Sequence, residues 1–414
     1  MNILYVTGLP IPLKDIIEGK MEKEITGLPG FYYPWKKLVD RGHNVDFVFI
    51  SNFKGKYNIK VQWFSKKNIL ANIYAPYTEV NFFRFIRQFV RFIQLLYYTY
   101  KATKTKKYDF IYCKAYEGFA GQIIGKIYKI PTGIRLFGDF TFCYTDIKKY
   151  GIFWGSIKHI FEFLSFKLGA NFLLATDDGS NCDKLFYLWN NYKTKFYFWK
   201  TGIDISLPEI NKPLTIRIRN KNYIYFAARY QNWKRHDRVI NVLKKLIDKN
   251  YKLDLVFTGN ITSQEYYESL KKLSKYLNVD QYVFFEKEIA QNDVKLLAKN
   301  AVANILMADN SNLGNVFFEI FSIGSIIISL KNRALEEYIV NGYNGFLVEN
   351  EDEVVEIIIK ILKEEIDSNK IKENAKKTAL ERFLSINERF DKEVELIEKT
   401  ARREKNIKIK LSKK

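Results

Sequence analysis

The feature that most limits the possible folds is an alternation of short apolar runs with amphipathic, helix-like segments, which occurs twice along the chain. The first series starts with NILYVT at residues 2–7 and ends with the apolar run at 196–199. A charged stretch precedes the second series, which starts at 223–227. Short apolar strands that alternate with helices are typical of parallel sheets covered by helices on both faces. The sequence therefore predicts an α/β chain of two Rossmann-like doubly wound domains.

The predicted boundaries follow from the two series. Residues 1–200 are expected to form the N-terminal Rossmann-like domain, and residues 201–385 the C-terminal one. Residues 386–414 are expected to form a helix with a basic tail that packs back toward the N-terminal domain.

The segment from Val302 to Leu330 carries the strongest local pattern. A short apolar strand is followed by a polar loop, and Gly314 and Asn315 then open a helix that contains Glu319 one turn later. Free amides and the positive end of a helix dipole favour a phosphate, while a nearby carboxylate accepts hydrogen bonds from hydroxyls. The segment indicates a site for a phosphate plus a polyol. An ordinary βαβ unit with a solvent-facing Glu319 explains this stretch equally well.

The loop after the first strand is a second candidate for ligand contact. Gly27 and Gly30 lie between that strand and the helix predicted at 31–41, at the edge where open parallel sheets bind ligands. Simple turn chemistry is the alternative for both glycines. The loop contains no GxGxxG, so a nicotinamide cofactor is not expected.

Cysteine and histidine usage argues against a metal site and a disulfide framework. None of these residues falls in a CxxC or HExxH pattern, and the chain has only three of each: Cys113, Cys143, Cys182, His43, His159 and His236. The sequence shows no signal peptide pattern and no apolar run of 18 or more residues. We therefore expect a cytoplasmic protein, or one bound peripherally to the inner face of the plasma membrane.

The net charge of +21 favours an anionic partner. Nucleic acid, an anionic membrane and phosphorylated substrates all satisfy it, but the sequence has no nucleic-acid-binding signature. Residues 81–107 form a basic, aromatic helix that is either a core helix with arginines at its edges or an interfacial helix on anionic lipid. Its predicted apolar stripe consists of Phe82, Phe85, Ile86, Phe89, Ile93 and Leu96, bordered by Arg84, Arg87 and Arg91.

Several stretches, taken in order, resemble the family-4 (group 1) retaining glycosyltransferases. They are RGHNV at 41–45, TGIDI at 201–205, ARYQNWKRHD at 228–237, SNLGNVFFEIFSIGSIIIS at 311–329 and YIVNGYNGFLV at 338–348. The resemblance covers most of the chain and is densest in its C-terminal half. It implies a GT-B fold, in which two Rossmann-like domains face a central cleft, the first binding the acceptor and the second the nucleotide sugar.

The resemblance also implies roles for individual residues. Arg229 and Lys234 match the cationic pair that grips the donor diphosphate, although exposed loop cations are the plain alternative. Glu319 matches the glutamate that holds the ribose hydroxyls. The remaining expected donor-binding residues are Gly30, Ser311, Leu313, Gly314, Asn315 and Val316. No metal and no cofactor are expected beyond the nucleotide diphosphate sugar as co-substrate.

The sequence departs from the family at two positions. Ser311 stands where the family has a second glutamate that touches the donor sugar, so it offers a hydrogen bond without a charge. The strand segment RLFGD at 135–139 lacks a histidine that many members carry. Asp139 could line the cleft as a catalytic residue in its place, or cap a helix.

The expected function is transfer of a hexosyl unit, with retention, from a UDP-sugar or GDP-sugar to a hydroxyl of a glycan or lipid-linked acceptor in cell-envelope polysaccharide or glycolipid synthesis. The leaving phosphate acts as the base in this family, so no protein nucleophile is expected. An anionic membrane surface is a possible partner through residues 81–107, and nucleic acid is not expected. The alternatives are a nucleotide-sugar epimerase of the same fold, and a non-catalytic glycan- or nucleic-acid-binding protein.

Overall fold

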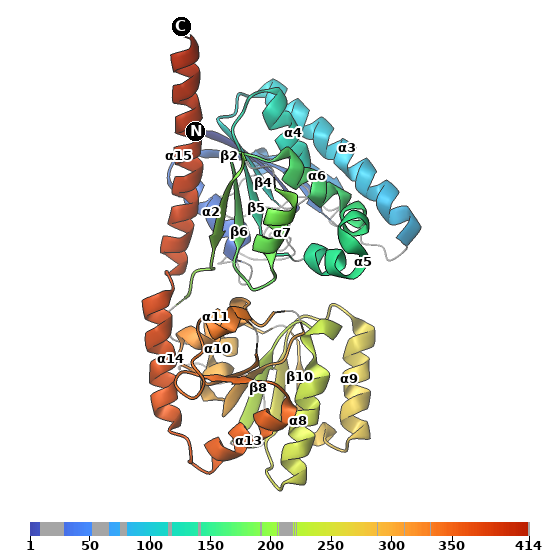
Figure 1. The fold of residues 1–414 in the computed structure, drawn as a ribbon, viewed down its shortest axis with the longest axis vertical. Coiled ribbons are helices and arrows are strands. Elements are labelled where there is room, and N and C mark those ends of the chain that lie inside the picture. The colour runs from blue at the N-terminus through green and yellow to red at the C-terminus, as the bar shows by residue number, and fades with distance from the viewer. Residues whose placement is uncertain are drawn as a thin grey trace. The chain divides into compact units, whose positions relative to one another are not determined.

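The chain forms two compact α/β units (Figure 1). Unit 1 consists of Met1–Lys200 and Asn387–Lys414, and unit 2 of Thr201–Ile386. Each unit contains one parallel sheet with helices on both faces, so the predicted fold class is confirmed. The computed structural model describes residues 1–8, 29–51, 66–74, 81–114, 118–139, 142–190, 193–204, 206, 218, 220, 222–287, 289–309, 311–331 and 333–412.

Unit 1 is built on a seven-stranded parallel sheet in the order β3-β2-β1-β4-β5-β6-β7. Its inner strands are nearly continuous apolar runs because helices cover both of their faces. The strand β3 has no counterpart in the sequence prediction. The strands are β1 (Asn2–Gly8), β2 (Asn44–Ser51), β3 (Ile69–Tyr74), β4 (Phe110–Lys114), β5 (Thr132–Leu136), β6 (Phe172–Thr176) and β7 (Lys195–Trp199).

Alternating side chains of these strands enter cores on opposite faces of the sheet. Tyr5 packs in the core that α2 (Pro29–Asp40) shares with α15 (Ile386–Ser412), whereas Leu4 packs in the core beneath α3 and α4. The helices of the second face, shown together in Figure 1, are α3 (Asn81–Thr105), α4 (Phe119–Ile127), α5 (Cys143–Lys158), α6 (Ile160–Leu168) and α7 (Cys182–Trp189).

The helix α15 is fixed to unit 1 by a buried charge cluster. The Glu393 carboxylate is fully buried, accepts a hydrogen bond from Tyr112 at 2.7 Å, and pairs with Arg389 at 3.2 Å and Arg135 at 3.4 Å. Burial alone would raise the pKa of Glu393, but the two guanidinium groups outweigh it and hold the pKa below its usual value. Charge pairing therefore supplements the apolar contacts that α15 makes with the sheet.

Unit 2 contains a six-stranded parallel sheet in the order β10-β9-β8-β11-β12-β13. The strand order reverses between β8 and β11, and ligands bind at this switch point in open α/β sheets. The strands are β8 (Tyr223–Ala227), β9 (Asp254–Thr258), β10 (Val283–Glu286), β11 (Ala303–Leu306), β12 (Ile327–Leu330) and β13 (Phe346–Val348). The helices are α8 (His236–Asp248), α9 (Gln264–Tyr276), α10 (Gln291–Asn300), α11 (Asn315–Ser322), α12 (Arg333–Glu336), α13 (Glu351–Leu362) and α14 (Ser368–Arg382).

The helix α3 turns part of its predicted apolar stripe outward. Leu95 and Ala102 are buried against the sheet, whereas Ile86, Phe89 and Ile93 are about half exposed. The side chains of residues 81–85 and 87, which include Arg84 and Arg87, lie outside the described part of the chain. Among the described helices, none is both long and apolar enough to cross a bilayer.

Candidate functional site

The loop that follows β8 is held close to the end of β9. The amide of Ala228 donates to the Thr258 carbonyl at 2.9 Å, and the amide of Tyr230 donates to the Asn260 carbonyl at 2.9 Å. A Cβ at Gly259, whose φ is +159°, would lie 1.9 Å from the Ala228 carbonyl oxygen. Glycine therefore permits the two strand ends to approach, and this approach sets the path of the β8 loop.

The predicted cationic pair lies on this loop. Arg229 is exposed and makes no hydrogen bond or ion pair with any other residue that the structure describes. Lys234 ends the short 3₁₀ helix η3 (Asn232–Lys234), and its Nζ lies 4.0 Å from the centroid of the Trp233 ring. Both residues follow the carboxyl end of β8, so one loop offers two cations at the switch point of the sheet.

A fully buried histidine supports the base of this loop. His236 begins α8 and stacks on Tyr230 with ring centroids 4.9 Å apart. Burial lowers the pKa of His236 to about 3, so its imidazole is neutral near pH 7. The residue therefore acts as part of the aromatic core and not as an acid or base.

Asp309 joins the β8 loop to the loop after β11. Its amide donates to the Trp233 carbonyl at 3.0 Å, and its Oδ1 lies 3.1 Å from Arg235 Nη1 and 3.3 Å from Arg238 Nη2. We call this set the Asp309 staple: Asp309, Trp233, Arg235 and Arg238. Arg235 and Asp309 are 74 residues apart, so no local sequence pattern indicates the contact. The staple therefore joins the loop after β8 to the loop after β11 through a hydrogen bond and ion pairs.

The N-terminus of α11 offers unused backbone donors. The amides of Gly314, Asn315 and Val316 donate to no other residue in the described ranges. Gly314 caps the helix from an exposed position, and a Cβ built on it would meet no atom within 4 Å. Three open amides at the positive end of a helix form a site suited to an anion.

Two other residues of the predicted donor set shape this loop from within. The amide of Leu313 donates to Ser311 Oγ at 3.1 Å, and the Leu313 side chain is buried in the core. Leu313 therefore offers a ligand neither its amide nor its side chain. Asn312, which the sequence analysis did not single out, accepts a hydrogen bond from the Ala308 amide at 3.0 Å and holds the loop closed.

Glu319 lies one turn into α11 and is half-buried. Its Oε1 accepts a hydrogen bond from Gln291 Nε2 at 3.0 Å. Burial raises the pKa of Glu319 to about 7, while the Gln291 hydrogen bond and the nearby Lys295 act in the opposite direction. The carboxyl group is therefore divided between its ionised and neutral forms near neutral pH.

The two predicted site residues of unit 1 lie near the carboxyl edge of its sheet. The Gly30 carbonyl accepts a hydrogen bond from Lys114 Nζ at 3.4 Å, and the predicted turn at Gly27 lies outside the described residues. Asp139 is buried, and its two oxygens accept hydrogen bonds from the amides of Cys143 at 2.8 Å and Tyr144 at 2.7 Å. The carboxylate thus caps the start of α5, which is the structural alternative for Asp139.

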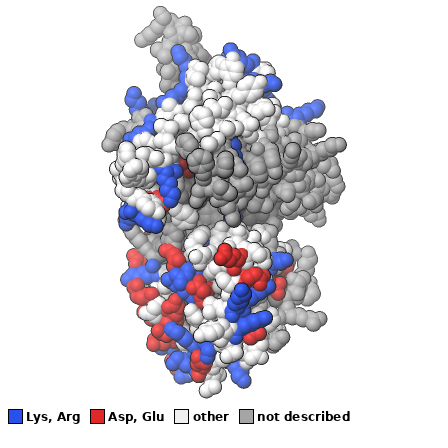
Figure 2. All heavy atoms as spheres, turned by 90° about the vertical axis from the view of Figure 1, so that its right-hand side faces the viewer, with Lys and Arg blue, Asp and Glu red and all other residues white. Residues whose placement is uncertain are grey.

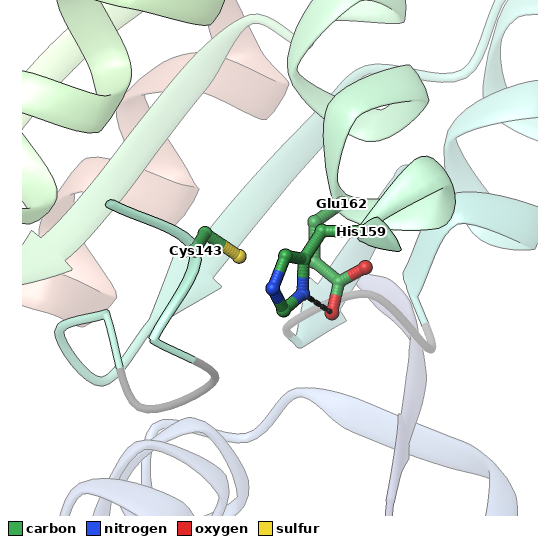
Figure 3. Close-up of side chains that lie close together, drawn as sticks. All are labelled: Cys143, His159 and Glu162. Carbon is green, nitrogen blue, oxygen red and sulfur yellow. Dashed lines mark ion pairs between the residues drawn. The ribbon is translucent and has the colours of Figure 1, made fainter. Parts of the chain in front are cut away.

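Unit 1 also brings together three side chains that could hold a metal ion. A ring nitrogen of His159, the Cys143 sulfur and a Glu162 oxygen lie within 4.8 Å of one another (Figure 3). Their sequence spacing gave no sign of this. His159 Nε2 is already hydrogen-bonded to Asp146 at 2.7 Å, and Nδ1 lies 4.0 Å from Glu162. Ligand atoms around tetrahedral zinc lie closer, at about 3.3–3.8 Å. We assign no metal to this cluster, which joins α5 to α6.

Residues 211–378 match the model of the family described as glycosyl transferases group 1. A curated relative from Dictyostelium discoideum, a GDP-Man:Man(3)GlcNAc(2)-PP-Dol alpha-1,2-mannosyltransferase, is 27% identical over 188 residues. That alignment covers 40% of this chain and 37% of the relative, so the chain matches well under half of the relative's length.

Solved structures match over nearly the whole chain. Anabaena HepE in complex with UDP has a TM-score of 0.66 at 16% identity, covering 96% of this chain and 100% of that one. A glycosyltransferase from Rickettsia africae has a TM-score of 0.62 at 17% identity, covering 96% and 98%. WaaG, a glycosyltransferase involved in lipopolysaccharide biosynthesis, has a TM-score of 0.61 at 14% identity, covering 96% and 99%. These similarities confirm the predicted GT-B fold.

Proposed function

We propose that this chain, whose residues 211–378 match the group 1 glycosyltransferase family, moves a hexosyl unit from a nucleotide diphosphate sugar to an acceptor hydroxyl. One observation carries the proposal. Two loop cations, the open amides of α11 and the Glu319 carboxyl group all occur around the β8–β11 switch point of unit 2. That combination matches the chemistry of a diphosphate attached to a ribose and a hexose.

Each part of the donor has a partner in this arrangement. Arg229 and Lys234 bind the diphosphate, because a guanidinium and an ammonium group form charge-assisted hydrogen bonds with phosphate oxygens. The amides of residues 314–316 bind the sugar or its phosphate, and Ser311 offers a hydroxyl to the hexose. Glu319 in its ionised form accepts hydrogen bonds from the ribose hydroxyls. The Asp309 staple keeps the two binding loops in register.

The same cations supply the main catalytic effect in this proposal. Negative charge grows on the departing nucleotide diphosphate, and fixed cations in place before the reaction stabilise that charge. We propose that Arg229 and Lys234 do so without a metal ion. Transfer proceeds with retention, the leaving phosphate accepts the proton of the acceptor hydroxyl, and no side chain acts as the nucleophile.

The proposed donor is a UDP-hexose or a GDP-hexose. The name of the Dictyostelium relative specifies GDP-mannose, whereas HepE has been solved with UDP and with UDP-glucose. Ser311 is uncharged and offers a single hydroxyl to the sugar. Because these relatives differ in their nucleotide, binding of UDP and of GDP to this chain has to be measured side by side.

The proposed acceptor is a glycan or lipid-linked saccharide of the cell envelope, presented at the inner face of the plasma membrane. The outward stripe of α3, which includes Ile86, Phe89 and Ile93, supports an anionic membrane surface as a partner. Residues 81–107 contain seven Lys or Arg and no Asp or Glu, so their charge suits acidic lipid headgroups. Binding to anionic lipid vesicles, measured for variants of α3, tests this contact.

The test of donor binding is a thermal-shift series with UDP, GDP, ADP and their hexose conjugates. A ligand that binds only the folded protein raises its melting temperature by mass action. We expect one nucleotide diphosphate to stabilise the wild-type chain and to have no effect on the Arg229→Ala/Lys234→Ala variant. The control is Lys244→Ala/Lys249→Ala, which removes one cation from α8 and one from the residue that caps its C-terminus, and it should leave the shift unchanged.

Product analysis completes the test. Transfer of labelled hexose to an added acceptor is expected, with a rate about 10³-fold lower in the Arg229→Ala/Lys234→Ala variant. Free sugar or an epimerised donor without any acceptor would identify an epimerase instead. If no nucleotide stabilises the wild-type chain, the transferase proposal fails and a non-catalytic binding protein becomes the better interpretation.

A further inference from the structure

An exposed apolar tip lies in the middle of α5. Every residue from 148 to 154 is exposed to solvent. Ile152 is 54% exposed, Phe153 65% and Trp154 64%. Three large apolar side chains in a row at such exposure need a partner other than water, because isolated soluble domains rarely present apolar groups together in this way.

The tip belongs to a tight helical hairpin. Gly151 has φ +81° and ψ 163°, which divides α5 into helical segments at 143–150 and 152–158. The second segment packs on the first so closely that a Cβ at Gly155 would lie 2.8 Å from the Cα of Ile147. Side chains with a Cβ rarely adopt φ near +80°, so glycine at 151 allows the reversal that exposes the tip.

The base of the hairpin is fastened to itself and to unit 1. Asp146 on the first segment pairs with Lys158 at 2.8 Å and with His159 at 2.7 Å. Cys143 and His159, which Figure 3 shows close together, are the first residue of α5 and the residue that caps its C-terminus. Trp189 of α7 donates to Ser156 Oγ at 3.0 Å. The fold therefore holds the tip in a defined position.

The helices near the tip also carry exposed apolar side chains. The helix α5 contacts α6 and α7, and α6 contacts α3 through the Phe161 and Phe92 rings, whose centroids are 5.4 Å apart. The tip and the outward stripe of α3 thus belong to one connected layer of helices. Exposed large apolar residues on this layer, besides the tip, include Ile86, Phe89 and Ile93 on α3, Ile157 on α5 and Leu164 on α6.

Basic side chains border the tip. Lys148 and Lys149 are exposed on its N-terminal side, and Lys149 Nζ lies 5.0 Å from the Tyr150 ring centroid. The one acidic residue of α5, Asp146, is paired within the hairpin. In Figure 2 few acidic side chains appear on the described surface of unit 1, whereas acidic and basic groups are interspersed over unit 2.

We propose that the α5 tip, residues 150–154, inserts among the headgroups of an anionic lipid bilayer. The aromatic and aliphatic tip suits the interfacial region, and the flanking lysines suit acidic headgroups. A second copy of the chain fits this surface less well, because the same lysines would then face each other. This membrane contact rests on the proposed function only for its biological role, which is to bring unit 1 to the membrane that holds a lipid-linked acceptor.

The test uses Trp154 as a reporter of depth. Wild-type and Trp154→Phe chains are mixed with vesicles of phosphatidylglycerol and phosphatidylcholine that carry brominated acyl chains. Bromine quenches tryptophan fluorescence only at short range, so we expect quenching in the wild type and its loss in Trp154→Phe. Vesicles of phosphatidylcholine alone should give little quenching. The buried Trp35 and Trp189 supply an unquenched background.

Co-sedimentation with the same vesicles separates the contributions of the apolar tip, of the lysines beside it and of α3 to membrane binding. Phe153→Ser/Trp154→Ser is expected to weaken binding about tenfold or more, since it removes two inserted aromatic rings. Lys148→Glu/Lys149→Glu tests the charge around the tip, and Lys101→Glu/Lys104→Glu tests two lysines near the C-terminus of α3; each should weaken binding to anionic vesicles. The matched control is Tyr276→Ser, which removes an 82% exposed ring from unit 2 and should have no effect.

Equal quenching in wild type and Trp154→Phe, or unchanged sedimentation of Phe153→Ser/Trp154→Ser, would overturn the proposal. A dimer in solution that Phe153→Ser/Trp154→Ser dissociates would also overturn it, in favour of contact between copies of the chain. The nucleotide-induced thermal shift is measured on the same variants. Because the tip is in unit 1, that shift should persist, so failure at the membrane is distinguishable from failure of the transferase proposal.

Discussion

The two sheets share the same order over six strands, to which unit 1 adds β7, but they differ at the edge where ligands bind. In unit 2 the residues beyond β8 and β11 are loop cations, open amides and a half-buried carboxyl group. In unit 1 the corresponding edge carries Lys114 at the end of β4 and Arg135 near the end of β5, which are 1% and 2% exposed. These two basic groups are buried beneath Phe137, Trp35 and the helix α15.

The difference shows that strand order alone does not make a ligand site. In unit 2 Arg229 is exposed to solvent, and Asp309 pairs with cations that are themselves partly exposed. In unit 1 Glu393 of α15 supplies the negative charge that Arg135 and Arg389 need, so these groups hold the fold together. We therefore expect substitutions at the edge of the unit 1 sheet to change stability, and substitutions at the edge of the unit 2 sheet to change nucleotide binding.

The largest effect is expected from Glu393→Gln. The substitution keeps the shape of the side chain but leaves Arg135 and Arg389 without the buried carboxylate with which they pair. Removing one partner of a buried ion pair costs about 3–5 kcal/mol of unfolding free energy. Denaturant unfolding should show this loss, while the surviving folded protein still binds the nucleotide. If stability changes by less than about 1 kcal/mol, charge pairing does not hold α15 in place.

An intermediate effect of opposite sign is expected from Glu319→Gln. Burial raises the pKa of Glu319 to about 7, whereas an unfolded glutamate ionises near pH 4.5. Between those values the folded chain binds a proton that the unfolded chain has released, so stability falls as the pH rises from about 4.5 to 7. Above pH 7 the full cost is present, about 3 kcal/mol for a pKa raised from about 4.5 to about 7.

Glu319→Gln should therefore stabilise the ligand-free protein at pH 8 and have little effect at pH 4. Nucleotide binding should weaken at pH 8, because the neutral amide replaces the carboxylate that accepts the ribose hydrogen bonds. Melting curves at both pH values, with and without nucleotide, measure the two effects. A variant that is less stable than wild type at pH 8 would show that Glu319 is a structural residue and not a ligand-binding one.

The smallest effect is expected from Asp309→Asn, which weakens the ion pairs of the Asp309 staple. Because the aspartate and its arginines are partly exposed, the loss of stability should be about 1 kcal/mol or less. The two binding loops would be held less firmly, so we expect nucleotide affinity to fall about fivefold. The control is Asp352→Asn, which removes an exposed pair with Lys245 in the same unit. Equal affinity losses in both variants would rule out a specific role for the staple.

The sequence allowed the fold class to be predicted because strands such as Tyr223–Ala227 are compact apolar runs between amphipathic helices. The turn-back of α5 could not be predicted, since it depends on the conformation of Gly151 and on packing of Gly155 against Ile147. Nor could the Asp309 staple, whose partners are far apart in the chain. Local patterns identify elements, whereas these features arise from contacts between elements.

Local sequence patterns also predicted the positions of some site residues better than those of others. Arg229, Gly314 and Glu319 lie beside the switch point of unit 2, where a strand-loop-helix pattern leads one to expect them. For Leu313 the pattern gave no sign that the side chain enters the core. Asp139 is a helix cap by its hydrogen bonds, an alternative that the sequence left open. The roles of all these residues in catalysis and donor binding stay predictions.

The return of α15 to unit 1 has a consequence for synthesis on the ribosome. All of unit 2 leaves the exit tunnel before α15 does, because unit 1 is interrupted in the sequence by Thr201–Ile386. Unit 2 can fold as an inserted domain while the first two hundred residues lack the helix that carries Glu393. Until α15 emerges, Arg135 has no counter-charge from Glu393 and one face of the seven-stranded sheet lacks part of its cover. This nascent chain is the state in which a chaperone would find the most exposed apolar surface.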